Sequence, residues 1–205
     1  MKELFKNWNT IPNWLSYIRI ALIPVFAVLF YNDHEIPALI ILVASGLTDF
    51  FDGKLARKLN QVSDLGKLLD PVADKLTQIT LAIVFYLEFS NSSVELIKTF
   101  SWIFLVFIIK ELVMVVFGAL MLVFGLRPVA AEFVGKAATM VFYIVMILIV
   151  MFGPDVGVLA DKIWTIPDKA LLVMVIVSAV LTVLAFFSYI PSTVKQVIEK
   201  IKKSK

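Results

Sequence analysis

Six stretches of apolar residues alternate with short polar stretches along the chain. Each stretch is close to the roughly 20 residues that a helix needs to cross a bilayer. The breaks between them contain Asn, Asp, Gly and Pro, which interrupt helices. The pattern predicts an all-α polytopic membrane protein with six transmembrane helices. The predicted spans are residues 11–31, 36–57, 67–89, 95–124, 131–153 and 165–190.

Composition supports this interpretation and excludes several function classes. The chain has 205 residues, of which 60% are hydrophobic and 17% charged, and its mean hydropathy is +0.94. A soluble domain of this length is only about half apolar. Cysteine is absent, so disulfides, thiolate metal sites and cysteine nucleophiles are excluded. Because no basic run is interleaved with aromatics in a soluble context, we expect no nucleic-acid partner.

Basic residues are distributed unequally between the loops on the two sides of the predicted spans. The positive-inside rule therefore predicts a multi-pass protein of the cell membrane with both termini in the cytoplasm. We expect a juxtamembrane segment at residues 1–10, a membrane domain at 11–190 and a basic cytoplasmic tail at 191–205. The predicted cytoplasmic basic residues are Lys2, Lys6, Lys54, Arg57, Lys58, Lys67, Arg127, Lys136, Lys195, Lys200, Lys202, Lys203 and Lys205.

Two pairs of aspartates interrupt this apolar pattern at the predicted cytoplasmic face. Asp49 and Asp52 are three positions apart, and Asp70 and Asp74 are four apart, so each pair lies on one helix face. Antiparallel neighbouring helices would bring the four carboxylates together, where they cannot all stay ionised without compensation. Oxygen ligands favour the hard divalent cations Mg²⁺, Mn²⁺ or Ca²⁺, and two such ions would neutralise four carboxylates.

Residues around the aspartates suit a metal-bound phosphate ester. Gly53 allows close approach of a ligand to the backbone, and Arg57 presents a planar fork of donors for phosphate. Asp64 is expected to be a solvated or helix-capping loop residue. Pro71 leaves two local structures open: a helix that begins at Pro71 with Asp70 as its cap, or one that begins near Asp64 and bends. The alternative interpretation is an ordinary charged loop, but carboxylates within a membrane are costly and usually functional.

Eight of these positions fit the pattern D-x2-D-G-x2-A-R-x8-G-x3-D-x3-D. They are Asp49, Asp52, Gly53, Ala56, Arg57, Gly66, Asp70 and Asp74. The pattern resembles the signature of the CDP-alcohol phosphotransferase (CDP-alcohol phosphatidyltransferase) family, and the six-span layout is also similar. The resemblance implies a metal-dependent enzyme that transfers the phosphatidyl group of a CDP-linked lipid to an alcohol and releases CMP. It also implies a homodimer.

The resemblance assigns roles to individual residues. It implies that Asp49, Asp52 and Asp70 bind the metals and that Asp74, also near a metal, is the base for the attacking hydroxyl. The implied contacts with the CDP-lipid are Gly53, Arg57, Ser63 and the segment Pro12, Asn13, Trp14 and Leu15.

The acceptor alcohol is less closely specified. The chain is similar to phosphatidylglycerophosphate synthases, which use glycerol 3-phosphate, in its PNWLSYIR segment and in Lys110 with Glu111, Arg127 and Lys136. We expect Lys110, Arg127 and Lys136 to contact a phosphorylated acceptor. Lys110 and Glu111 could instead form a structural ion pair, and Arg127 and Lys136 could serve topology alone.

Other acceptors and other classes of protein stay open at this point. Cardiolipin synthase and phosphatidylinositol phosphate synthase of the same family are alternatives, and an ion or proton transporter is the alternative from another class. An intramembrane prenyltransferase also uses aspartate-rich segments, but its motifs differ. Arg19 lies inside the first span, where we expect it to face the polar cavity or to pair with a carboxylate.

Overall fold

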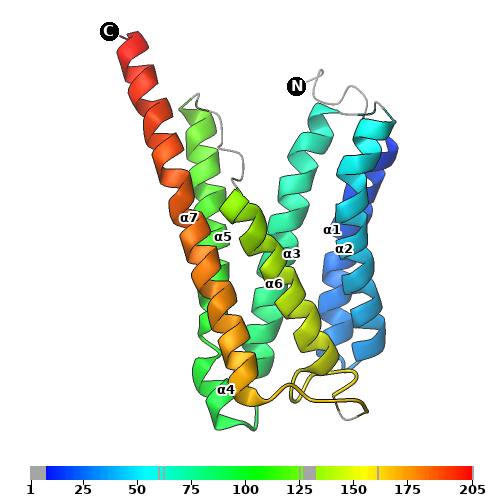
Figure 1. Cartoon of the computed structure of the whole chain (residues 1–205). Coiled ribbons are helices and arrows are strands. Elements are labelled where there is room, and N and C mark those ends of the chain that lie inside the picture. The colour runs from blue at the N-terminus through cyan, green and yellow to red at the C-terminus, as the bar shows by residue number, and fades with distance from the viewer. Residues whose placement is uncertain are drawn as a thin grey trace.

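Long α-helices run up and down the molecule as one bundle (Figure 1). The computed structural model describes residues 8–204 except 60, 62, 125, 127–132 and 161. For residues 49–57, 64, 67–68, 122, 133, 201 and 203–204 it describes the backbone alone. The helices in the described residues are α1 (Ile11–Tyr31), α2 (Glu35–Lys58), α3 (Asp64–Ser90), α4 (Glu95–Phe100), α5 (Ile103–Val123), α6 (Phe133–Phe152) and α7 (Asp168–Ser204).

The predicted all-α class is confirmed, since the described part of the chain contains helices and no strand. Four described segments are long and apolar enough to cross a membrane: Ile11–Tyr31, Glu95–Met121, Val134–Phe152 and Asp168–Lys200. The apolar part of α2, Glu35–Thr48, is shorter. The structure therefore supports a multi-pass membrane protein, while the count of six spans stays a prediction.

Local chemistry explains where α1 and α3 begin. The Thr10 side chain accepts a hydrogen bond from the Asn13 backbone N–H, which caps α1. Ser63 caps α3 in the same way through the N–H of Gly66. α3 therefore begins at Asp64 rather than at residue 67, and Asp64 is its first residue rather than a loop residue. Pro71 lies inside this helix.

Two further predicted elements need correction. The predicted span 95–124 is interrupted at Ser101 and Trp102, because the Ser101 hydroxyl donates to the Lys98 carbonyl and the following backbone bonds join residues three apart. The last helix begins at Asp168 rather than 165 and continues past Pro191 to Ser204, so the predicted tail extends α7.

Aromatic rings hold the helices together at the end of the bundle that contains α4. The Phe85 ring of α3 lies 5.7 Å from Phe30 of α1 and 5.8 Å from Phe104 of α5. Phe107 of α5 continues the cluster to Phe142 of α6, with 5.0 Å between ring centroids. All five rings are buried. This end is also closed by the segment before α7, where Ser92 donates to the Asp155 carboxylate over 2.6 Å.

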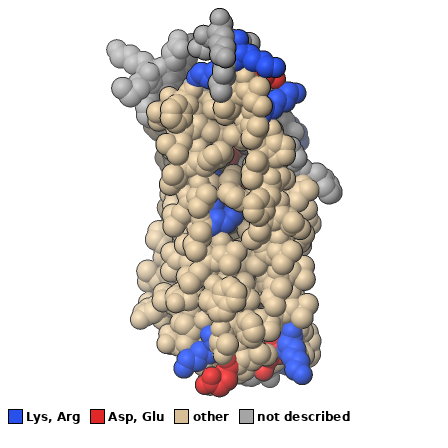
Figure 2. All heavy atoms as spheres, turned by 90° about the vertical axis from the view of Figure 1, so that its left-hand side faces the viewer, with Lys and Arg blue, Asp and Glu red and all other residues tan. Residues whose placement is uncertain are grey.

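Charged and uncharged residues occupy different zones of the outer surface. On the face drawn in Figure 2, Lys, Arg, Asp and Glu gather at the two ends of the molecule. Between these ends lies a wide band of other residues that is broken by one basic patch. Such a band is expected where a bundle is surrounded by lipid. The start of α1, the end of α2 and the start of α3 share the end of the bundle opposite α4 (Figure 1).

Candidate active site

A polar clip joins the start of α1 to the start of α3. The Ser63 hydroxyl donates to Asn13 Oδ1 over 2.9 Å and accepts from the Gly66 N–H, also over 2.9 Å. Asn13 Nδ2 in turn donates to the Trp8 carbonyl over 3.0 Å. Asn13 and Ser63 are both buried. We call Asn13, Ser63 and Gly66 the Asn13 clip.

Gly66 belongs to this clip for steric reasons. A Cβ atom added at Gly66 would lie 2.6 Å from Asn13 Oδ1 and 3.0 Å from Ser63 Oγ. The first distance is shorter than side-chain packing allows, and the second is tighter than most such contacts. The glycine of the motif is therefore needed so that α1 and the start of α3 can approach each other.

The segment predicted to contact the donor lipid divides into two parts. Pro12 and Asn13 are buried, whereas Trp14 is exposed and Leu15 is half-buried. The Trp14 indole N–H donates to Asn9 Oδ1 over 2.6 Å. Asn13 and Ser63 thus engage each other, and Trp14 and Leu15 are the members of the segment that are more open to a ligand.

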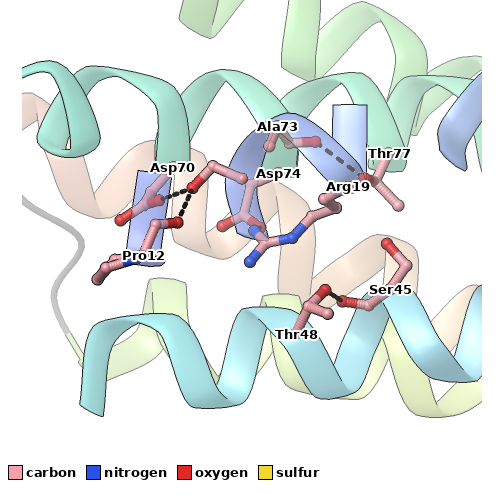
Figure 3. A network of polar contacts seen from close by, with 9 residues as sticks. Pro12, Arg19, Ser45, Thr48, Asp70, Ala73, Asp74 and Thr77 are labelled. Atoms are coloured by element: carbon pink, nitrogen blue, oxygen red, sulfur yellow. Dashed lines mark hydrogen bonds and ion pairs between the residues drawn. The ribbon is translucent and has the colours of Figure 1, made fainter. Parts of the chain in front are cut away.

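The second aspartate pair is held by residues of α1. The Ser16 hydroxyl donates to Asp70 Oδ1 over 2.7 Å. The Pro12 carbonyl, one turn earlier in α1, is a longer hydrogen-bond partner of the same hydroxyl, at 3.4 Å. One turn later, Asp74 Oδ1 lies 3.5 Å from Arg19 Nη1. Figure 3 shows the Arg19 guanidinium and the Asp74 carboxylate turned toward each other between α1 and α3.

These two contacts differ in burial. The Arg19 side chain is only 1% exposed, whereas that of Asp74 is 34% exposed. The Asp74 side chain is therefore partly accessible to a ligand, although its Oδ1 atom is buried, while its basic partner is shielded. The expectation that Arg19 pairs with a carboxylate is confirmed. Ser16 was not predicted, although Asn13, Ser16 and Arg19 recur every three residues on one face of an apolar helix.

The first aspartate pair lies on the last turns of α2. Asp49 and Asp52 belong to the continuous helix that ends at Lys58, as do Gly53 and Arg57, and their side chains lie outside the described residues. Ser45 of α2 and Thr77 of α3 line the same small cavity. Ser45 precedes Asp49 by one turn and Thr77 follows Asp74 by three residues, so this cavity lies beside the segments of α2 and α3 that carry the two pairs (Figure 3).

Basic residues predicted to contact the acceptor have different surroundings. Lys110 donates to Glu111, which also accepts from Lys75 of α3 over 2.8 Å. The ion pair between Lys110 and Glu111 is thus present. Lys136 is exposed near the start of α6, and Arg127 lies outside the described residues.

The residues present fit a divalent cation in their chemistry. Asp70 and Asp74 supply carboxylate oxygens one turn apart, which is the donor type that Mg²⁺ and Mn²⁺ prefer. Among the side chains that the structure describes, no group of three or more Asp, Glu or His forms a metal site. A complete cradle therefore depends on Asp49 and Asp52.

The fold and these contacts define a helical membrane protein in which two carboxylates of α3, Asp70 and Asp74, contact side chains of α1 at one end of the bundle. Residues 9–198 match the model of the CDP-alcohol phosphatidyltransferase family, and the chain belongs to that family.

Individual relatives carry two kinds of name. A CDP-diacylglycerol--glycerol-3-phosphate 3-phosphatidyltransferase of Yersinia pestis is 32% identical over 200 residues, covering 92% of this chain and 97% of the relative. A Mycobacterium tuberculosis protein whose name includes "cardiolipin synthase" is 40% identical over 138 residues, covering 66% of this chain. A cardiolipin synthase (CMP-forming) of Streptomyces coelicolor is 36% identical over 136 residues, or 63% of this chain. The chain spans about three fifths of the length of these last two relatives, 61% and 60%.

Proposed function

We propose that the protein transfers the phosphatidyl group of CDP-diacylglycerol to glycerol 3-phosphate, with release of CMP. The observation that carries the proposal is the placement of Asp70 and Asp74 one turn apart on α3, against buried polar partners from α1. Family membership over residues 9–198 supports the reaction type. The name of the Yersinia pestis relative, which is aligned over 97% of its length, supports this acceptor.

The proposed chemistry uses the carboxylates for two tasks. Asp74 takes the proton from the acceptor hydroxyl as that oxygen forms a bond to the phosphatidyl phosphorus, and the bond from this phosphorus to the CMP oxygen breaks. Asp49, Asp52, Asp70 and Asp74 would hold two Mg²⁺ or Mn²⁺ ions. When bound, these ions supply neutralisation of the diphosphate and stabilisation of the leaving CMP.

The protein's own contacts support this division of labour. Ser16 fixes the orientation of the Asp70 carboxylate with a short hydrogen bond of 2.7 Å. The Arg19 guanidinium, 3.5 Å from Asp74 Oδ1, holds that carboxylate in place against α1. Gly53, Arg57, Ser63 and residues 12–15 are proposed to contact the CDP-lipid. Lys110, Arg127 and Lys136 are proposed to contact the acceptor phosphate.

The proposal includes an arrangement in the membrane. Six spans would place both termini and the aspartates at the cytoplasmic face, where the water-soluble glycerol 3-phosphate is available. Residues 11–190 would form the membrane domain, flanked by a juxtamembrane segment at 1–10 and a basic tail at 191–205. We propose a homodimer as the assembly.

A second acceptor is favoured by one specific observation. The Mycobacterium tuberculosis relative, at 40% identity, is named for cardiolipin synthase, whose lipid acceptor would be phosphatidylglycerol. Its sequence identity to this chain is higher than that of the Yersinia pestis relative, 40% against 32%, but the alignment covers less of either protein. Phosphatidylglycerol is therefore the acceptor to compare directly with glycerol 3-phosphate.

The deciding experiment offers several acceptors to the same preparation. Purified protein with CDP-diacylglycerol and Mg²⁺ or Mn²⁺ receives glycerol 3-phosphate, phosphatidylglycerol or inositol phosphate, and CMP and the lipid product are measured. Phosphatidylglycerophosphate is the expected product. Product from another acceptor alone would contradict the glycerol 3-phosphate assignment. Ion flux in liposomes without release of CMP would favour a transporter.

A further inference from the structure

Two consecutive residues of α3 form ion pairs with two different helices. Asp74 pairs with Arg19 of α1, and Lys75 donates to Glu111 of α5 over 2.8 Å. Neighbouring residues on an α-helix point about 100° apart around its axis. The two ion pairs therefore hold one turn of α3 from two directions.

Glu111 pairs with two lysines, Lys75 and Lys110, and it is the most buried of the three residues. Its side chain is 2% exposed, whereas Lys75 is 27% and Lys110 16% exposed. A carboxylate enclosed in an apolar helix bundle is stable only when it is paired, and removal of one partner leaves the other charge without compensation. Glu111 is therefore constrained to stay with the lysines, and Lys75 is constrained to face α5.

This turn of α3 has a reason to need such support. Pro71 lies inside the helix and lacks the N–H that would donate to the carbonyl of Lys67. The missing bond removes one backbone constraint from the turn that carries Asp70, so the backbone alone holds this part of α3 less firmly than in an unbroken helix. Contacts from α1 and α5 supply the constraint.

We propose that Glu111 is a positioning residue that acts through Lys75 to fix the rotation of α3 and so to aim Asp74 at the acceptor hydroxyl. This inference rests on the proposed function, because it gives Asp74 the role of base. Glu111 itself contacts no substrate in this scheme. Its effect through Lys75 is on the rate of transfer.

Kinetics of single and double variants test the route from Glu111 to Asp74. Glu111→Gln is expected to lower kcat about tenfold or more while KM for CDP-diacylglycerol changes less than about threefold. Lys75→Gln should cause the same loss, and the double variant should lose no more than either single variant. Glu95→Gln is the matched control, since Glu95 is exposed on α4 and should leave kcat unchanged.

Specific outcomes would overturn the inference. Wild-type kcat in Lys75→Gln would show that Glu111 does not act through Lys75. A rise in the acceptor KM alone, reproduced by Lys110→Gln, would show that Glu111 serves acceptor binding instead. If Glu111→Gln fails to fold, Glu111→Asp keeps the charge on a shorter side chain. A kcat between those of wild type and Lys75→Gln would then support the inference, and wild-type kcat would overturn it.

A distance measurement separates this inference from the proposed function. The chain has no cysteine, so spin labels attach only at introduced Val25→Cys on α1 and Leu76→Cys on α3, both exposed positions. Glu111→Gln should shift or broaden the label distance by about 3 Å, the arc of a roughly 30° helix rotation. An unchanged distance would overturn the inference even if the transfer reaction is confirmed. Absence of transfer in the wild-type protein would overturn the proposed function and leave this measurement valid.

Discussion

The end of the bundle that contains Phe85 and the end that contains Asp74 are held together in different ways. At the first, rings from α1, α3, α5 and α6 pack against one another over a broad area. At the second, single atoms make the contacts, such as Ser16 Oγ with Asp70 Oδ1. Packing of this kind tolerates small shifts of a helix, whereas a hydrogen bond weakens steeply with angle and distance.

This difference gives the two ends different roles. Polar contacts orient side chains at one end, and ring packing holds the helices together at the other. Lipid is as apolar as the rings, so the aromatic end is stabilised by close packing rather than by exclusion of water. Directional polar contacts at the other end specify where the Asp70 and Asp74 carboxylates point. Substitutions at the two ends are therefore expected to affect different quantities, stability at one end and transfer at the other.

Asp74→Asn, at the polar end, is expected to have the largest effect on transfer. Loss of the proposed base should lower kcat for CMP release about a thousandfold while the fold is retained. Steady-state release of CMP from CDP-diacylglycerol measures this effect. Asp33→Asn is the matched control, because Asp33 lies at the opposite end with a φ of 57°, which Asn also tolerates. Wild-type kcat in Asp74→Asn would contradict its role as base.

Phe85→Ala should break the aromatic end. Phe85 contacts rings on both α1 and α5, so its removal leaves a cavity and should cost roughly 3–5 kcal/mol of stability. Thermal inactivation in detergent measures the loss. The kcat of the surviving folded protein should stay near that of wild type. A normal inactivation temperature with low kcat would reverse the assignment of roles to the two ends.

Gly66→Ala tests how closely α1 and α3 must approach at the polar end. The added methyl would lie 2.6 Å from Asn13 Oδ1, so the Asn13 clip must open. We expect kcat/KM for the CDP-lipid to fall on the order of tenfold to a hundredfold. Gly118→Ala is the control, since a Cβ there meets nothing within 4 Å. Equal effects of the two substitutions would show that helix propensity, and not the clip, is responsible.

Ser16→Ala should give the smallest effect. It removes one hydrogen bond to Asp70, worth about 1 kcal/mol or about fivefold in an equilibrium constant. The expected result is a fivefold increase in the Mn²⁺ concentration needed for half-maximal binding, measured by calorimetry without substrates. Ser90→Ala removes a hydroxyl bonded to the Leu87 carbonyl at the other end of α3 and should not alter metal binding.

The bounds of the long helices were more predictable from the sequence than the contacts between them. Long apolar runs and their polar breaks predicted α1 with its observed bounds and α6 to within two residues. The interruption at Ser101 was missed, because it depends on a side-chain hydrogen bond to Lys98 within an otherwise continuous apolar run.

At the polar end, spacing identified the aspartates but not their partners. Asp70 and Asp74 could be placed on one helix face from the helical period alone. The bonds from Ser16 and Arg19 join residues more than 50 positions apart, so they depend on how α1 packs against α3. Hydropathy does not specify that packing. The ion pair between Lys75 and Glu111 could not be predicted from the sequence for the same reason, since it depends on how α3 packs against α5.

Gly66 shows that the aspartate motif reflects two requirements, the packing of α1 against α3 and the chemistry of the carboxylates. Its missing side chain admits Asn13 and Ser63, so this position reports how helices assemble rather than how phosphate reacts. A descendant that lost Asp70 and Asp74 but kept Gly66 would preserve the helix pairing without the chemistry. Such a chain would still look like a relative by its helices and spacing, and only its carboxylates would distinguish a working enzyme from an inactive descendant.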